Sequence, residues 1–102
     1  MTKHALDPVI HAPNRLQICA FLAPLEEAEF QILREELEVS ESVLSKHISR
    51  LVEAEYISVR KSPVNGRQRK WASLTEKGRT AFSAHVATLQ RIVAGTADLT
   101  NG

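Results

Sequence analysis

The sequence predicts a mostly helical α+β fold in which three short helices precede a β-hairpin and a long final helix. Apolar residues recur at helical spacings between residues 14 and 55 and again between 75 and 95, whereas the stretch between them alternates and contains a turn. The length of 102 residues suits one domain, and the 43% hydrophobic and 25% charged residues are typical of a globular protein.

The N-terminal third is expected to hold an arm and two helices. Residues 1–13 are predicted to form an irregular arm, because prolines interrupt them. Asn14 is placed to cap a first helix, which Pro24 would stop. An acidic loop then leads to a brief second helix over residues 30–37.

The third helix, over residues 40–55, has the clearest pattern in the chain. The hydroxyl of Ser40 is placed to accept from the first free amides of this helix. An apolar stripe follows at spacings of i, i+4, i+7 and i+8, made by Leu44, Ile48, Leu51 and Val52. We expect this stripe to be buried and the opposite face to be open to solvent.

Alternation from residue 57 predicts a hairpin that ends near residue 74. Its turn contains Asn65-Gly66, a pair that tolerates the positive φ angles of a tight reversal. Two strands are marginal alone, so the hairpin should pack on the helices. Thr75 then caps a final helix that Gly95 is expected to end, and residues 96–102 are predicted to be a flexible tail.

Charge is divided unevenly along the chain, although the net charge is only +1. Residues 25–41 hold seven acidic residues and one basic, a local charge of −6. Residues 42–79 hold nine basic and three acidic residues, a local charge of +6. The second segment should attract phosphate, so its basic side chains are candidates for nucleic-acid contact.

The polar face of the third helix is the first candidate DNA-binding surface. On a helical wheel its short or basic side chains lie opposite or beside the apolar stripe: Ser42, Ser45, Lys46, Ser49 and Arg50. A helix that enters the major groove needs short side chains for close approach and donors for phosphates and base edges. An ordinary amphipathic helix with a solvated face is an equally good interpretation of this helix alone.

The hairpin favours DNA binding. It concentrates five cations on or beside one short turn, with no acidic residue between them: Arg60, Lys61, Arg67, Arg69 and Lys70. Their mutual repulsion would be offset along a phosphate backbone or in a minor groove. Protection of edge strands is the alternative role for such a charged hairpin.

Several runs together resemble the multiple antibiotic resistance regulator (MarR) family. These runs are His11–Leu16 (HAPNRL), Leu44–Leu51 (LSKHISRL), Ala54–Ile57 (AEYI) and Leu74–Arg79 (LTEKGR). The sequence is most similar to the short single-domain members, and part of the third-helix pattern is shared with arsenic-repressor-like regulators. The resemblance covers most of the chain.

The resemblance implies a winged helix-turn-helix domain over residues 14–95, with a two- to three-stranded β wing. It implies that helix 40–55 reads the major groove of double-stranded DNA, that hairpin 57–74 is the wing, and that the protein is a homodimeric, sequence-specific transcriptional regulator. Arg67 would be the wing-tip arginine, although the family often has Asp-x-Arg where this chain has Asn65-Gly66-Arg67. The dimerisation helix would be 75–95, with interface residues Phe82, Val86, Leu89, Ile92 and Val93.

Other functions find little support in the sequence. No enzyme signature and no metal-ligand spacing is present, so we expect no catalysis, no metal and no cofactor. The chain lacks a membrane-span pattern and has one cysteine, Cys19, so a cytoplasmic protein without a membrane partner is expected. We expect Cys19 to be a core residue rather than a redox sensor, His47 to be structural and Trp71 to pack beneath the wing. A winged-helix module that binds another protein instead of DNA is the main alternative.

Overall fold

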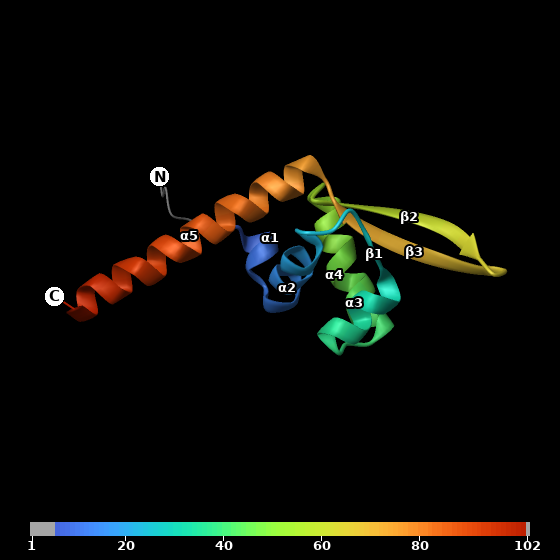
Figure 1. Cartoon of the computed structure of the whole chain (residues 1–102), viewed down its shortest axis with the longest axis horizontal. Helices are drawn as coiled ribbons and strands as arrows, with labels where there is room; N and C mark the ends of the chain where they lie inside the picture. Colours follow the sequence, from blue (N-terminus) through green and yellow to red (C-terminus); the bar gives the residue numbers. More distant parts are fainter. Residues whose placement is uncertain (1–5, 102) are drawn as a thin grey trace.

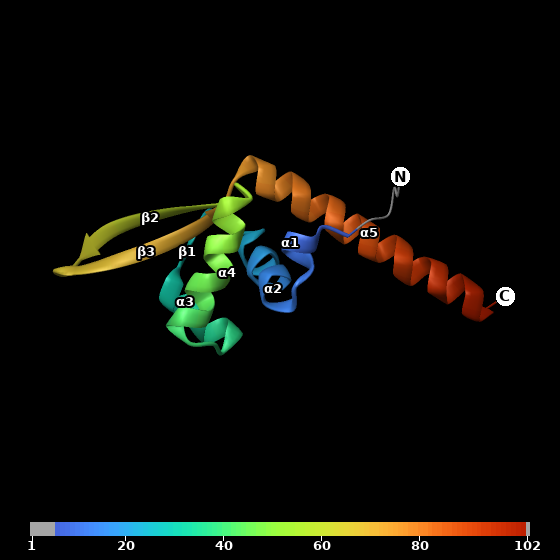
Figure 2. The ribbon, with the colours of Figure 1, turned by 180° about the vertical axis from the view of Figure 1, so that it is seen from behind.

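The fold is a helical body from which a β-hairpin and a long helix extend on opposite sides (Figure 1). The computed structural model describes residues 6–101, with side chains described to residue 95. The described elements, in chain order, are α1 (Pro8–His11), α2 (Pro13–Leu22), β1 (Ala28–Glu29), α3 (Phe30–Leu37), α4 (Glu41–Glu53), β2 (Ile57–Val64), β3 (Arg67–Leu74) and α5 (Glu76–Asn101). Figure 2 shows the same arrangement from behind, with α4 between the hairpin and α5.

The core lies where α2, α3 and α4 meet the inner ends of the strands. Its fully buried side chains include Ile10, Ile18, Leu22, Leu33, Leu44 and Leu51. Val52 was predicted to belong to the buried stripe of α4, but it is 41% exposed. On a wheel of about 100° per residue it lies about 80° from Leu44, at the edge of the stripe, so that prediction was wrong.

Part of the predicted arm, residues 8–11, is a short helix; residues 1–5 of the arm lie outside the described residues. Asp7 caps the short helix α1, since its Oδ1 accepts from the amides of Val9 (2.9 Å) and Ile10 (3.4 Å), and Ile10 is fully buried. Asn14 does not cap α2. That helix begins at Pro13, whose fixed φ suits the first helical turn, and it has no side-chain cap.

The sheet has three antiparallel strands in the order β1-β3-β2. The short strand β1, within the segment expected to be an acidic loop, pairs Ala28 with Ala72 and Glu29 with Trp71. β2 and β3 pair continuously from Ile57↔Leu74 to Val64↔Arg67. The turn residues Asn65 and Gly66 have φ angles of 52° and 77°, which confirms the predicted tight reversal.

Helix α5 is longer than predicted. Thr75 caps it as expected, because its Oγ1 accepts from the amide of Gly78 at 2.9 Å. The helix then passes through Gly95 to Asn101, so the predicted end at Gly95 and the tail over residues 96–101 were wrong; residue 102 lies outside the described residues. Gly95 lacks the positive φ of a helix-ending glycine. None of the helices in the described part of the chain is long and apolar enough to cross a membrane.

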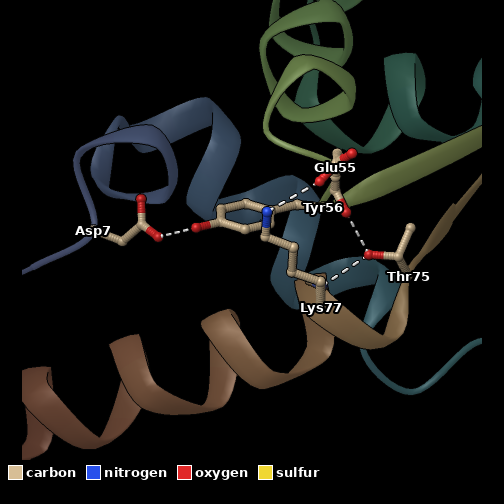
Figure 3. A network of polar contacts seen from close by, with 6 residues as sticks. Asp7, Glu55, Tyr56, Thr75 and Lys77 are labelled. Atoms are coloured by element: carbon tan, nitrogen blue, oxygen red, sulfur yellow. Dashed lines mark hydrogen bonds and ion pairs between the residues drawn. The ribbon is translucent and has the colours of Figure 1, made fainter.

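A polar junction joins α4, β2 and α5 (Figure 3). Thr75 donates from its hydroxyl to the carbonyl of Glu55 at 2.6 Å and from its amide to the carbonyl of Tyr56 at 3.0 Å. The ammonium of Lys77 pairs with the carboxylate of Glu55 at 3.2 Å. Gly78 packs so closely here that a Cβ atom would lie 2.1 Å from the carbonyl oxygen of Tyr56. The root of the hairpin is therefore fixed against the first turn of α5.

Asp7 connects this junction to the N-terminal segment. Its Oδ2 accepts from the hydroxyl of Tyr56 at 2.6 Å, and this bond, with burial, raises the pKa of Tyr56 to about 12. The amide of Asp7 donates to Nδ1 of His85, which is buried in α5. The rings of His85 and His11 lie 5.5 Å apart. These contacts tie the first helix to both α5 and the start of β2.

Candidate nucleic-acid interface

The predicted polar face of α4 is open. Ser42, Lys46, Ser49 and Arg50 are exposed, and Ser45 is half-buried. Buried Leu44, Ile48 and Leu51 fix the orientation of this face, because they anchor the other side of the helix in the core. Ser40 caps the helix by accepting from the amide of Val43 at 3.2 Å. The face thus presents serine hydroxyls, one ammonium and one guanidinium on a rigid element, and the described chain leaves all of these residues except Ser45 exposed.

His47 holds α4 against α2. Its Nε2 lies 3.2 Å from the side-chain nitrogen of Asn14, and its Nδ1 lies 3.3 Å from Nη1 of Arg15. A neutral imidazole has one acceptor nitrogen, so His47 accepts from one of these two donors at a time. Burial, then the charges of Arg15 and Lys46, lowers the pKa of His47 and favours this neutral form. The contacts support the structural role expected for His47.

The five wing cations fall into two groups. The first group is engaged within the protein. Arg60 donates to both carboxylate oxygens of Glu27 at 2.6 to 3.0 Å, and Arg69 donates to Glu29 at 2.5 Å. Lys70 lies 5.2 Å from the centre of the Phe30 ring. The hydrogen bond from Arg60 lowers the pKa of Glu27, which keeps that carboxylate charged.

The second group, Lys61 and Arg67, is exposed and has no acidic partner among the side chains described. Arg67 directly follows the turn, at the tip of the hairpin. Carboxylates of Glu27 and Glu29 therefore offset the expected repulsion between cations at Arg60 and Arg69. No carboxylate among the described side chains offsets the charges of Lys61 and Arg67. The sequence analysis did not identify Glu27 and Glu29 as partners of the wing arginines. The acidic segment that precedes the basic hairpin could have indicated such pairs.

Trp71 is half-buried and lies under a cation of the wing itself. It lies opposite Arg60 in the β2–β3 ladder, and the Arg60 guanidinium is 4.2 Å from the ring centre. Its other neighbour in the sheet is Glu29. A base could stack on this face of Trp71 only by displacing Arg60, so the contacts favour a structural role.

The predicted dimer residues are divided along α5. Phe82 packs against the protein's own core, and Val86 and Leu89 are half-buried. Farther along, Ile92 is 44% exposed and Val93 is 65% exposed. The outer part of the helix therefore carries large apolar side chains that the body leaves in contact with solvent.

Cys19 lies in the core and is fully buried. Burial is the main cause that raises the pKa of its thiol to about 11, and the charge of Asp7 adds to it. A protonated, inaccessible thiol is unsuited to redox sensing, so the structure supports the core role predicted for Cys19.

The pair of helices α3 and α4, the hairpin behind them and the short strand β1 define a winged helix domain. The chain belongs to the winged helix DNA-binding domain family, whose profile matches residues 14–93. This family membership confirms the fold class that the sequence predicts.

Similar proteins agree with this assignment. An uncharacterized protein of Methanocaldococcus jannaschii is 35% identical over 78 residues, which cover 76% of this chain and 85% of that protein. The structure of a transcriptional regulator homologue from Pyrococcus horikoshii matches with a TM-score of 0.81 at 24% identity, over 86% of this chain and 87% of the other. YusO of Bacillus subtilis matches with a TM-score of 0.73 at 20% identity, over 95% of this chain and 64% of the other. The resemblance to MarR-type regulators is confirmed at the level of the fold.

Proposed function

We propose that this protein is a transcriptional regulator that binds double-stranded DNA in a sequence-specific manner as a homodimer. Helix α4 would enter the major groove and the β2–β3 hairpin would act as the wing. The observation that carries the proposal is the exposed face of α4, which consists of serines and basic side chains. It belongs to a domain of the winged helix DNA-binding family. The same site offers no paired catalytic groups, which favours a binding protein over an enzyme.

The contacts divide the predicted DNA-binding residues by role. Lys46 and Arg50 are exposed on α4 and are proposed as the main anchors in the groove, with the serines beside them. Lys61 and Arg67 would contact flanking backbone or the minor groove. The remaining wing cations are already held, at least in part, by protein groups, so each would have to share or exchange its partner to reach phosphate; these are Arg60, Arg69 and Lys70.

A second copy of the chain is the proposed partner of α5. At about 1.5 Å per residue a helix of this length extends roughly 39 Å, and among its side chains described to residue 95 the body covers mainly those before residue 90. Pairing of two such helices would bury Ile92 and Val93, which are otherwise among the most exposed large apolar residues. A twofold dimer could place two copies of α4 in successive major grooves about 34 Å apart. DNA binding also favours the cytoplasmic location expected from the sequence.

The test is a double variant, Lys46→Ala with Arg50→Ala, measured by fluorescence anisotropy on a duplex selected from a random pool. We expect affinity to fall at least about 30-fold, since each lost contact is worth roughly 1–3 kcal/mol. Both side chains are exposed, so the urea midpoint should stay within error of wild type.

Lys77→Gln is the control, because it removes an exposed positive charge outside the α4 face, and its ion pair with Glu55 joins two exposed side chains and so contributes little to the junction. It should leave affinity nearly unchanged. Wild-type affinity in the double variant would refute the site. A protein that dimerises but enriches no duplex from the pool would instead support a protein-interaction module.

A further inference from the structure

A hollow of about 320 Å³ lies between the wing and the first turns of α3 and α4. Four cationic side chains line it, Arg34, Arg67, Arg69 and Lys70, together with the carboxylates of Glu29 and Glu41. The lining charge is therefore +2. A hollow of this size has room for one phosphate group and part of its hydration shell.

Two buried donors in this lining have no acceptor. The Nε atoms of Arg34 and Arg69 are both shielded from solvent and make no hydrogen bond. Buried polar atoms without a partner are rare in folded proteins, because removing them from water is unfavourable unless another group replaces the water. Their presence on two arginines of the same hollow means that these guanidinium groups are not fully satisfied within the chain, so they can turn toward an acceptor from outside it.

The carboxylates at the rim engage other nitrogen atoms. Glu29 accepts from Nη1 of Arg69 at 2.5 Å. Glu41 lies 4.0 Å from Nη1 of Arg34, and the side chains of this pair are 69% and 42% exposed, respectively. An exposed pair at such a distance is weak, so Arg34 can turn to an incoming anion at little cost.

We propose that this hollow binds one phosphate group of the DNA backbone, and that Arg34 is a DNA-contacting residue. The proposal rests on the proposed function. Both Glu41 and Arg67 line the hollow; Glu41 precedes Ser42 on the α4 face, and Arg67 belongs to the wing tip. A strand that runs from the groove occupied by α4 to the wing must cross between these two points. Guanidinium groups suit the site because their fixed N–H pairs match phosphate oxygens.

The first test is the salt dependence of duplex binding by Arg34→Gln. Each phosphate contact contributes about 0.9 to the slope of log K against log salt, so the slope should fall by about 1.8 for a dimer that carries two such sites. Lys77→Gln removes the same charge at the hairpin root, away from the hollow, and should leave the slope unchanged.

A second pair of variants reports on the acidic rim. Glu41→Gln should raise affinity at low salt, because it removes a charge that repels phosphate and frees Arg34. Glu76→Gln is the matched control: it is also the first residue of a helix that follows a side-chain cap, but it lies at the start of α5. Equal affinities for Glu41→Gln, Glu76→Gln and wild type would contradict the proposal.

The source of the phosphate can be separated by observing the arginine Nε–H signals of the ¹⁵N-labelled protein. We expect the signals of Arg34 and Arg69 to shift on addition of duplex at a concentration where inorganic phosphate alone leaves them unmoved. Shifts produced by inorganic phosphate and not by duplex would assign the hollow to a free anion and overturn the proposal. An unchanged slope in Arg34→Gln, while Lys46→Ala with Arg50→Ala abolishes binding, would refute this inference and leave the proposed function standing. If the wild-type protein binds no duplex, both this inference and the proposed function are refuted.

Discussion

Replacement of Gly78 by alanine tests how tightly α5 is set against the root of the wing. A Cβ at this position would lie 2.1 Å from the carbonyl oxygen of Tyr56 and 2.9 Å from its carbonyl carbon. Since these are backbone atoms, no side-chain rotation relieves the contact, and the first turn of α5 must move by about 1 Å. That movement would also strain the bonds from Thr75 to the Tyr56 carbonyl and from Gly78 to the Thr75 hydroxyl.

The expected cost combines opposing effects. Alanine is favoured over glycine in a helix interior by about 1 kcal/mol. Overpacking costs about 1–3 kcal/mol, and loss of a helix cap about 1 kcal/mol. A net loss of roughly 1–3 kcal/mol in the free energy of unfolding should result, measured by urea denaturation at one fixed protein concentration.

Gly95→Ala is the matched control within the same helix. Nothing lies within 4 Å of a Cβ built at Gly95, so only the propensity gain applies there and the variant should be as stable as wild type or up to about 1 kcal/mol more stable. If Gly78→Ala matched Gly95→Ala in stability, the close approach of α5 to Tyr56 would be incorrect.

Two further predictions concern buried titratable groups. Burial is the main cause that lowers the pKa of His85 from its ordinary value of 6.5; the charge of His11 adds to it, and Asp7 has a smaller raising effect. The unfolded chain therefore binds the proton more tightly than the folded protein does. The contribution of His85 to the free energy of unfolding should be fully present above about pH 6.5 and fall as the solution is acidified. His85→Gln, which keeps an acceptor for the Asp7 amide, should flatten the plot of urea midpoint against pH, and an unchanged slope would exclude His85 as a cause. The Cys19 thiol, fully buried with a pKa of about 11, should resist iodoacetamide at pH 8 in the native protein, because only about one thousandth of it is thiolate, and react readily in urea. Equal rates in both conditions would restore a redox role for this residue.

Features governed by local chemistry were predicted well from the sequence. Ser40 and Thr75 cap their helices, and Asn65-Gly66 makes the turn, because each depends on bonds or φ angles within a few residues. The errors arose where distant contacts decide. Asn14 lies inside α2, which begins one residue earlier, and its side chain contacts His47, a residue 33 positions away; β1 pairs with β3, whose paired residues lie more than 40 residues later in the chain.

The sequence predicted which side chains of the candidate site are exposed on α4, but not which cations of the wing are paired with carboxylates. Which side chains of α4 are open follows from helical periodicity, and the structure agrees for the exposed Lys46 and Arg50. The state of the wing does not follow from periodicity, since Arg60 and Arg69 are paired with carboxylates 33 and 40 residues earlier in the chain. Arg34 went unnoticed because it is the single cation of an acidic segment, and only the folded hairpin brings other cations to it.

The position of Asp7 bears on how the protein can be shortened or fused. One carboxylate and one amide of this residue serve the start of α1, the hydroxyl of Tyr56 and the imidazole of His85. Trimming the chain at Pro8 would therefore remove three contacts at once, to α1, to Tyr56 and to α5. Affinity tags and fluorescent reporters attached at the N-terminus should leave Asp7 and its backbone amide in place, because a chain that begins at Pro8 loses the contacts of this residue with α1, Tyr56 and His85.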